Sequence, residues 1–356
     1  MKNNKQQGRL ATPRQVIETI KKYRTFIVTS HVNLEGDALG SQLALGHLIE
    51  KIGKKSAKGG SASGRKVWYV DETPVPETYR FLPKQEKVST DLSIPRQAEI
   101  LITVDCPNQE RIGKVAQYIR SDTLVVTIDH HISNQRFGDL NWVEPRAAAT
   151  GEMIYTLYKT AGIPIDTTAA MNLYAAIATD TGQFSYSNTT AQTHRIITEL
   201  IAKGVEPYAV SEKIYESNSL GSRRLLGKVL DTLNVVHDGK TGYVCVTQQM
   251  LKETGCTTDD TEGFCNYARS IKGVEVGLLF RETEDPRKVK ISFRSKGLVD
   301  VNQVAGEFGG GGHRAASGCV IDGSLEEVKE RVLSVVERAL ETVEEGKKRE
   351  SSNYSS

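Results

Sequence analysis

The sequence lacks the features of a membrane, secreted or disulfide-stabilised protein. No apolar run in its 356 residues approaches the roughly 20 residues needed to cross a bilayer. The opening stretch, MKNNKQQ, has no apolar core of the kind found in signal peptides. The 5 cysteines are scattered and include no Cys-x-x-Cys pair, which argues against a disulfide framework. We therefore expect a cytoplasmic protein with reduced thiols and no membrane contact.

The sequence also lacks a strong net charge. The 46 Lys and Arg residues nearly balance the 44 Asp and Glu residues, giving a formal charge of +2. No global field therefore draws the chain onto nucleic acid or a membrane, and any basic surface must be local. A hydrophobic content of 38% fits a globular protein, and the length suggests two domains.

Apolar strands alternate with amphipathic helices through the first half of the chain. We expect strands at 24–30, 66–70, 100–104 and 123–128. Helices are expected at 39–52, ending at Gly53, and at 150–161 and 168–179. Residues 13–191 are therefore predicted to form an α/β domain whose mostly parallel sheet is flanked by helices.

The second half has a different pattern. Residues 192–233 carry helical patterns, and 192–238 are predicted to form a helical connector. Residues 239–345 are predicted to form a smaller mixed α/β domain, in which Ser324 and Glu327 open a long final helix with a capping-box pattern. The polar residues 346–356 are predicted to form a disordered tail.

Acidic and imidazole side chains follow several of the predicted buried segments. Each has a simpler explanation when taken alone, such as a helix cap for Asp37 or a turn before Pro107 for Asp105. Taken together they are four carboxylates and two imidazoles, and carboxyl ends of parallel strands are where α/β sheets bind their ligands. The candidate metal ligands are His31, Glu35, Asp37, Asp105, His130 and Asp180.

This set is too large and too negative for one small cation. Two divalent cations that share a bridging carboxylate would neutralise it, and mixed oxygen and nitrogen ligands suit Mn²⁺, with Co²⁺ or Mg²⁺ as alternatives. A pair of cations activates water and stabilises the leaving oxygen of an in-line displacement. The residues therefore indicate a metal-dependent enzyme that hydrolyses phosphoester bonds.

These motifs resemble those of the DHH phosphoesterase superfamily, over almost all of residues 14–343. The family's triplet stands at Asp129-His130-His131, and its other motifs correspond to His31-x-x-x-Glu35-x-Asp37, Val104-Asp105 with Arg111-Ile-Gly113, and Asp180-Thr-Gly182. The second half resembles the DHH-associated C-terminal domain through Phe308-Gly-Gly-Gly-Gly-His-Arg-Ala-Ala-Ser317. Phe137–Val143 and Thr261–Phe264 are similar to the subgroup of nanoRNA oligoribonucleases that also remove the 3′-phosphate of 3′-phosphoadenosine 5′-phosphate, the NrnA type.

The resemblance implies a role for each residue. His31 and Glu35 would hold one cation, Asp37, His130 and Asp180 the other, and Asp105 would bridge them. His131 would contact the scissile phosphate as a charge stabiliser or proton donor, and Asp129 would orient an imidazole. The chain departs from the family's usual Pro-Asp at Leu34-Glu35, where glutamate reaches one methylene further.

The second domain is expected to bind the substrate. Gly310, Gly311 and Gly312 let backbone amides approach a phosphate or a base, and His313 adds a side-chain donor. Arg269 and Arg294 lie in a locally basic segment, although solvated surface charge is the simpler explanation for both.

We therefore expect a two-metal phosphodiesterase that degrades short single-stranded RNA and linear dinucleotides to mononucleotides. By resemblance, it would also act on 3′-phosphoadenosine 5′-phosphate and form a homodimer. Two alternatives stay open: a phosphodiesterase for cyclic dinucleotides, and a catalytically weak nucleotide-binding module, which Glu35 suggests.

Overall fold

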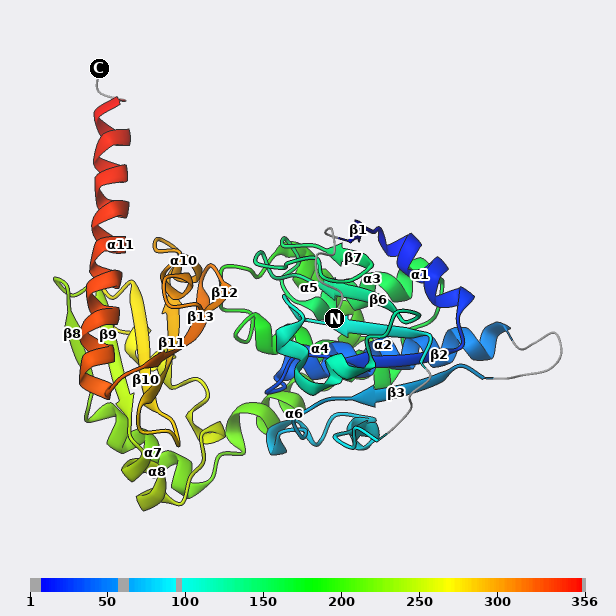
Figure 1. Cartoon of the computed structure of the whole chain (residues 1–356), viewed down its shortest axis with the longest axis horizontal. Helices are drawn as coiled ribbons and strands as arrows, with labels where there is room; N and C mark the ends of the chain where they lie inside the picture. Colours follow the sequence, from blue (N-terminus) through cyan, green and yellow to red (C-terminus); the bar gives the residue numbers. More distant parts are fainter. Residues whose placement is uncertain (1–7, 57–63, 94–97, 354–356) are drawn as a thin grey trace. The chain divides into compact units, whose positions relative to one another are not determined.

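The computed structural model describes residues 8–56, 64–93 and 98–353, with the side chains of 54–56 and 346–353 left out. The chain divides into two compact units, Met1–Ser217 and Asn218–Ser356. The division falls inside the segment 192–238 that the sequence predicts as a connector. Figure 1 draws both units, and each is described by itself.

The first unit is built on a seven-stranded sheet of order β1-β7-β6-β5-β2-β3-β4. Every neighbouring pair of strands in it is parallel. The strands are β1 (Arg9–Leu10), β2 (Thr25–Thr29), β3 (Lys66–Val70), β4 (Val88–Ser89), β5 (Ile100–Val104), β6 (Leu124–Asp129) and β7 (Leu140–Val143). The mostly parallel sheet flanked by helices agrees with the predicted fold class.

The central strands form because they are β-branched and buried on both faces. All five residues of β5 are buried, as are five of the six in β6. Strands β3 and β5 have the bounds predicted from the sequence. The edge strands β1 and β4 have two residues each and were not predicted.

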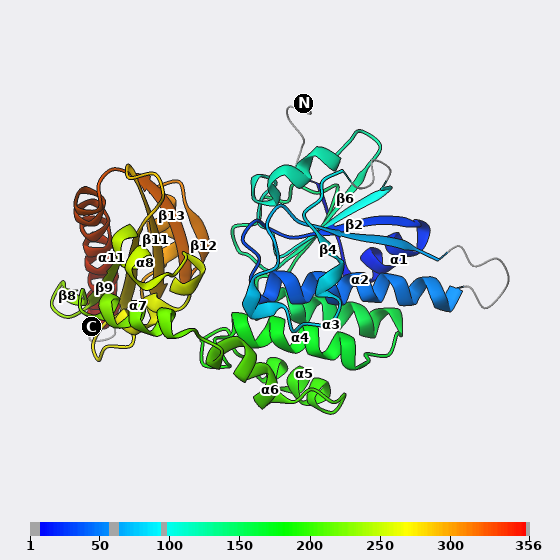
Figure 2. The same cartoon turned by 90° about the horizontal axis from the view of Figure 1, so that it is seen from below.

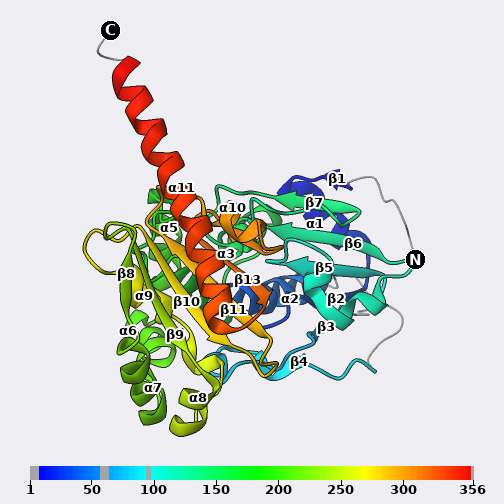
Figure 3. The same ribbon diagram turned by 60° about the vertical axis from the view of Figure 1, so that its left-hand side comes forward.

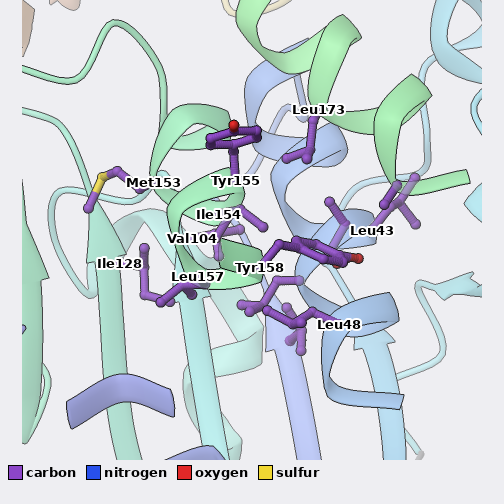
Figure 4. Packing of buried hydrophobic residues seen from close by; sticks show 14 of the residues in the cluster. Leu43, Leu48, Val104, Ile128, Met153, Ile154, Tyr155, Leu157, Tyr158 and Leu173 are labelled. Atoms are coloured by element: carbon purple, nitrogen blue, oxygen red, sulfur yellow. The ribbon is translucent and has the colours of Figure 1, made fainter. Parts of the chain in front are cut away.

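One face of this sheet packs on a layer of helices, which Figure 2 shows edge-on. The helices of this unit are α1 (Pro13–Lys22), α2 (Gly36–Ser56), α3 (Thr150–Ala161), α4 (Thr167–Asp180), α5 (Ala191–Ile201) and α6 (Pro207–Ser211). Their apolar sides and one face of the sheet share a single core, part of which Figure 4 shows: Leu43 and Leu48 of α2, Leu157 and Tyr158 of α3, and Leu173 of α4 meet Val104 and Ile128 of the strands.

The opposite face of the sheet has a smaller core. Ile27, Leu101 and Val125 pack there with Val115 and Tyr118. The last two belong to the 3₁₀ segment η4 (Glu110–Tyr118), which covers this face. Both faces of the central strands are therefore shielded from water.

Helix α2 does not end at Gly53, as the sequence predicts, but continues to Ser56. A Cβ at Gly53 would lie 3.1 Å from the backbone nitrogen of Arg65. Gly53 therefore lies inside the helix and lets the segment at Arg65 approach it closely. It does not end the helix.

The segment between the two cores is helical over most of its length. Helices α5 and α6 belong to the first unit, and a π-helical turn, η5 (Glu212–Glu216), follows α6 directly. Helix α7 (Leu220–Leu230) packs in the second unit. Strand β8 (Asn234–Val236) lies at the end of the predicted connector, directly after the helical pattern expected over 192–233.

The second unit contains a six-stranded mixed sheet of order β12-β13-β11-β10-β9-β8. Its other strands are β9 (Thr241–Val246), β10 (Val276–Glu282), β11 (Lys288–Ser295), β12 (Gly311–His313) and β13 (Ala316–Asp322). Only the β9–β10 pair is parallel. Helices α10 (Val301–Gly306) and α11 (Leu325–Asn353) share one core with the sheet, while α7, α8 (Gln248–Thr254) and α9 (Phe264–Arg269) share another. Figure 3 shows α11 lying across β10 and β11.

Helix α11 begins at the predicted capping box, in which Ser324 and Glu327 hydrogen-bond each other's backbone nitrogen. It continues through Asn353, so the prediction of a disordered tail from residue 346 is wrong for residues 346–353. Glu, Lys and Arg in this stretch are good helix formers and extend a helix already anchored by its apolar residues. The remaining residues 354–356 lie outside the described part of the chain. None of the described helices combines the length and apolar composition needed to span a membrane.

Candidate metal centre

The predicted ligands of the first unit lie at the point where the strand order of the sheet reverses. The chain moves from β2 to β3 on one side and from β5 to β6 on the other, while β2 and β5 are direct neighbours. A crevice forms outside the carboxyl ends of the strands at such a point. His31 follows β2, Asp105 follows β5, and Asp129 is the last residue of β6.

Asp105 is at the centre of this site. Its Oδ2 lies 3.6 Å from Nε2 of His31, and its Oδ1 lies 3.5 Å from Nε2 of His130. The same Oδ1 accepts a hydrogen bond of 3.0 Å from Oγ1 of Thr150. Asp105 adopts φ +53°, a left-handed conformation that is costly for a residue other than glycine. This strained backbone turns the carboxylate toward both imidazoles.

Asp37 is held by the start of another helix. Helix α3 has no side-chain cap of its own at Ala149. Instead, its first backbone N–H groups, from Thr150 and Gly151, donate to Oδ2 and Oδ1 of Asp37 at 2.6 and 2.9 Å. Ser41 donates a further hydrogen bond to Oδ1. The positive end of α3 therefore fixes the Asp37 carboxylate.

The two imidazoles are oriented by backbone carbonyls. Nδ1 of His31 lies 2.8 Å from the oxygen of Val32, and Nδ1 of His130 lies 3.0 Å from the oxygen of Ala147. A carbonyl oxygen only accepts, so in the neutral ring each Nδ1 carries the proton and each Nε2 carries the lone pair. Nε2 of His130 faces Asp180 and Asp37 at 3.4 and 3.8 Å. This is the tautomer that binds a cation through Nε2.

The electrostatics show how strongly the buried groups need a counterion. Burial disfavours a charged imidazole, yet the surrounding carboxylates raise the pKa of His31 and of His130 to about 10. Burial and the charge of Asp105 raise the pKa of Asp37, and burial raises that of Asp180 to about 7. Burial would raise the pKa of Asp105 too, but His31, His131 and His130 together lower it. Without a cation, protons must therefore balance the carboxylates.

His131 is oriented differently from the other two histidines. Its Nδ1 donates to Oδ1 of Asp129 at 2.7 Å, and Nδ2 of Asn134 donates to Oδ2 of the same carboxylate at 2.6 Å. Asp129 is fully buried, and His131 is 4% exposed and lies 3.6 Å from Asp105. Asp129 therefore contacts an imidazole, as the sequence predicts for a residue that orients one.

The predicted substrate residues of the second unit lie in one row across its sheet. His313 pairs with Ala316, Ala316 with Arg294, and Arg294 with Gly277. Side chains of residues paired in this way point to the same face of a sheet. Arg269, the last residue of α9, packs on that face, because a Cβ at Gly277 would lie 2.7 Å from its Cβ.

The glycine run forms the end of this row. Gly310 follows α10, and Gly311 and Gly312 belong to the edge strand β12. The side chain of Asn302 accepts a hydrogen bond of 2.9 Å from the nitrogen of Gly312. His313, Arg294 and Arg269 thus lie on one face of the second sheet, and Gly311 and Gly312 belong to its edge strand.

Comparison with known proteins identifies the family. The model of the DHH family, N-terminal domain, matches residues 25–177, and that of the DHHA1 domain matches residues 241–342. A protein of Thermus thermophilus named bifunctional oligoribonuclease and PAP phosphatase NrnA is 31% identical over 92% of this chain and 94% of its own length. The chain belongs to the DHH family.

Two further proteins agree with this placement. A protein of Bacillus subtilis with the same name as the Thermus protein is 31% identical over 86% of this chain and 92% of its own length. The crystal structure of an exopolyphosphatase-related protein from Bacteroides fragilis matches with a TM-score of 0.79, at 27% identity over 93% of this chain and 96% of that one. As a DHH phosphoesterase, the chain is a phosphoester-hydrolysing enzyme.

DHH enzymes are metal-dependent, and the residues of this chain fit divalent cations. Among the groups of side chains that bring three ligand atoms close together, two consist entirely of predicted ligands: His31, Glu35 and Asp105, and Asp37, Asp105 and His130. Asp105 belongs to both groups, as a bridging ligand would. The donors are carboxylate oxygens and imidazole nitrogens without a thiolate, which suits Mn²⁺, Mg²⁺ or Co²⁺.

Glu35 differs from the other candidate ligands in its exposure. Its side chain is 51% exposed, whereas that of His31 is 3% exposed, and the two are 3.5 Å apart. The preceding Leu34 is buried in the core. Leu34 thus anchors the loop in the core, and Glu35 lies at the exposed rim of the site.

Several residues that support the DHH motifs were not predicted from the sequence. Thr150 and Gly151 act mainly through backbone N–H groups, which every residue type except proline supplies, so no sequence signal marks them. Asn188 donates to the backbone oxygens of Ala148 and Asp180 and ties the end of α4 to the start of α3. Gly113 of the Arg-Ile-Gly motif has φ +56°, and a Cβ there would lie 1.9 Å from Oε2 of Glu72.

Proposed function

We propose that this enzyme is a two-metal phosphodiesterase that hydrolyses very short oligoribonucleotides, including linear dinucleotides, to mononucleotides. We further propose that it removes the 3′-phosphate of 3′-phosphoadenosine 5′-phosphate. The observation that carries the chemistry is the position of Asp105 between two imidazoles and two groups of ligands. The names of the relatives from Thermus thermophilus and Bacillus subtilis support the choice of substrates.

The ligand assignment follows the two groups. His31, Glu35 and Asp105 would hold one cation, and Asp37, Asp105, His130 and Asp180 the other, with Mn²⁺ as the best match to these donors. When bound, the two cations would supply Lewis-acid activation of water and stabilisation of the leaving oxygen. The protein's own contribution is to hold these carboxylates in place through α3 and the imidazoles through backbone carbonyls.

His131 would act on the substrate. Asp129 keeps the proton of His131 on Nδ1 in the neutral ring, so Nε2 is the nitrogen that faces a reacting group. A protonated Nε2 would donate to a phosphate oxygen or to the leaving group, and the buried Asp129 carboxylate would stabilise the imidazolium.

The row on the second sheet would bind phosphates and bases of the substrate. Arg269 and Arg294 provide charged, planar donors that pair with phosphate oxygens. The backbone of Gly310, Gly311 and Gly312 can approach a ligand closely, and His313 lies in the same row as Arg294. Residues 239–345 would thus form the substrate-binding domain and residues 13–191 the catalytic domain.

A turnover panel tests the proposal. Purified enzyme is given a linear dinucleotide, a pentanucleotide, a long structured RNA, a cyclic dinucleotide and 3′-phosphoadenosine 5′-phosphate, each with Mn²⁺, Mg²⁺, Co²⁺ or chelator. We expect fast Mn²⁺-dependent release of mononucleotides from the two short RNAs, phosphate release from the 3′-phosphorylated nucleotide, and little attack on the long RNA. Faster turnover of the cyclic than of the linear dinucleotide would favour a cyclic-dinucleotide phosphodiesterase. Binding of nucleotide without turnover in any metal would indicate a nucleotide-binding module.

A further inference from the structure

A buried carboxylate outside the ligand set lies next to the candidate metal centre, in contact with the residue that precedes His31. Asp71 follows β3 and is 1% exposed. Its Oδ1 accepts hydrogen bonds from the nitrogen of Ser30 at 2.9 Å and from Oγ1 of Thr29 at 3.2 Å. Its Oδ2 accepts from Nε2 of Gln42 at 2.6 Å. Burial of a carboxylate is costly, so a carboxylate with this many donors has a defined place in the site.

Ser30 carries the contact from Asp71 to the neighbouring strand. Its backbone nitrogen donates to Asp71, and its hydroxyl donates to the backbone oxygen of Val104 at 2.7 Å. Ser30 is the residue before His31, and Val104 is the residue before Asp105. The chain of hydrogen bonds therefore joins the ends of β3, β2 and β5 one residue below two of the ligands.

Gln42 extends the same network to α2. Its Nε2 donates to Val28 of β2 as well as to Asp71, and the side chain is fully buried. Asp37 lies in the first turn of this helix. Asp71 thus connects the strand that precedes His31, the strand that precedes Asp105 and the helix that carries Asp37.

We propose that Asp71 is a positioning residue of the metal centre. Acting through Ser30, it holds His31 and Asp105 at the separation that a cation requires, and so sets the affinity of the cation that His31, Glu35 and Asp105 bind. Gln42 anchors the carboxylate from the other side. This inference rests on the proposed two-metal function and adds a determinant of affinity that contacts neither substrate nor cation.

The test compares Asp71→Asn with a matched control in the full-length protein. Glu99 makes the same kind of contacts at the opposite end of β2, where its Oε2 accepts from the nitrogens of Arg24 and Thr25 and from Oγ1 of Thr25. Metal-stripped wild type, Asp71→Asn and Glu99→Gln are titrated with Mn²⁺ by calorimetry, and their metal-free unfolding midpoints are recorded. Loss of a residue that orients ligands typically weakens metal binding about 10- to 100-fold.

We expect wild type and Glu99→Gln to bind two Mn²⁺ with equal affinities. In Asp71→Asn, one of the two Mn²⁺ should bind about 10-fold or more weakly, and excess Mn²⁺ should restore kcat. A structural role alone would lower the unfolding midpoint and leave both affinities unchanged, and that result would overturn the inference. If Asp71→Asn fails to fold, Ser30→Ala decides, because it removes only the hydrogen bond to Val104 and should weaken the same Mn²⁺. Wild type that binds no Mn²⁺ would overturn the proposed function together with this inference, whereas unchanged affinities in both variants would overturn this inference alone.

Discussion

Nδ1 of His131 donates a 2.7 Å hydrogen bond to Oδ1 of Asp129, and this contact separates His131 from the other histidines of the site. His31 and His130 are oriented by carbonyl groups, so each neutral ring would present the lone pair of Nε2 to a cation. His131 is instead oriented by a carboxylate, the arrangement found in histidines that transfer protons. The three imidazoles therefore differ in what they are suited to bind.

The first prediction concerns this pair. His131→Ala should lower kcat about 10²- to 10⁴-fold, the usual contribution of a proton-transferring side chain. Asp129→Asn should lower kcat about 10- to 100-fold, because the amide does not stabilise an imidazolium. Steady-state kinetics on a linear dinucleotide measure both. Bound Mn²⁺ should be unchanged in each variant, and a parallel loss of Mn²⁺ would move His131 into the ligand set.

The second prediction compares Asp105, the proposed bridging ligand, with the more exposed Glu35. Asp105→Asn should abolish binding of both cations, since Asp105 belongs to both ligand groups. Glu35→Gln should weaken only one, because the side chain of Glu35 is 51% exposed and reaches the site from its rim. Metal analysis after gel filtration would then give fewer bound Mn²⁺ in the first variant than in the second.

The control for the second prediction is Glu35→Asp. The DHH family usually has aspartate at this position. The shorter side chain should therefore keep the cation that Glu35 would hold with His31 and Asp105. Equal metal content in Asp105→Asn and Glu35→Gln would contradict a bridging position for Asp105.

The sequence indicates which candidate residues lie close together where a polar side chain follows a predicted strand. Asp105 and Asp129 follow apolar strands, and carboxyl ends of adjacent parallel strands meet at one edge of a sheet, so the strand pattern alone indicates that they lie close together. Asp71 has the same signature, since it follows the apolar strand β3. The strand pattern therefore places Asp71 at the same edge of the sheet.

Other features depend on contacts between distant segments. The cap that Asp37 provides for α3 joins residues more than a hundred positions apart, and the donors are backbone N–H groups. In the sequence, Gly53 resembles a helix end. In the structure it lies inside α2, where the absence of a side chain lets the backbone of Arg65 approach the helix. Local patterns carry no information about such approaches.

The third prediction concerns substrate binding. Arg294→Ala should raise KM for a linear dinucleotide about 10- to 100-fold, since a hydrogen bond to a charged group contributes about 1.5–3 kcal/mol. Lys290→Ala is the matched control, because Lys290 lies on the same face of β11 but pairs with Arg281 and not with Gly277. Its KM should change little, and kcat and bound Mn²⁺ should stay constant in both variants. An equal rise in KM in the two variants would indicate a general charge effect and no specific role for Arg294.

The fourth prediction concerns stability and pH. Glu50 of α2 is partly buried, with a side chain 21% exposed, and lies 2.5 Å from Nζ of Lys84 and 3.0 Å from Nζ of Lys87. Burial opposes its charge, but hydrogen bonds with His47, Lys84 and Lys87 lower the pKa of Glu50 below its ordinary value. A carboxyl group with a lowered pKa in the folded state stabilises the protein above its unfolded pKa of about 4.3. That stabilisation is lost as the pH falls toward the lower, folded-state pKa.

Urea denaturation of the wild type and of Glu50→Gln at pH 7 and pH 3.5 measures this effect. At pH 7 the variant should be less stable by about 1 kcal/mol, because both lysines lose their partner. At pH 3.5 the difference should shrink, since Glu50 in the unfolded wild type is then mostly protonated and must lose this proton when the protein folds. Arg14 and Glu18 form an exposed i,i+4 pair on α1, so Glu18→Gln should show no comparable dependence on pH. A gap between the wild type and Glu50→Gln that widens in acid would show that the pKa of Glu50 is raised in the folded state, contrary to the contacts with both lysines.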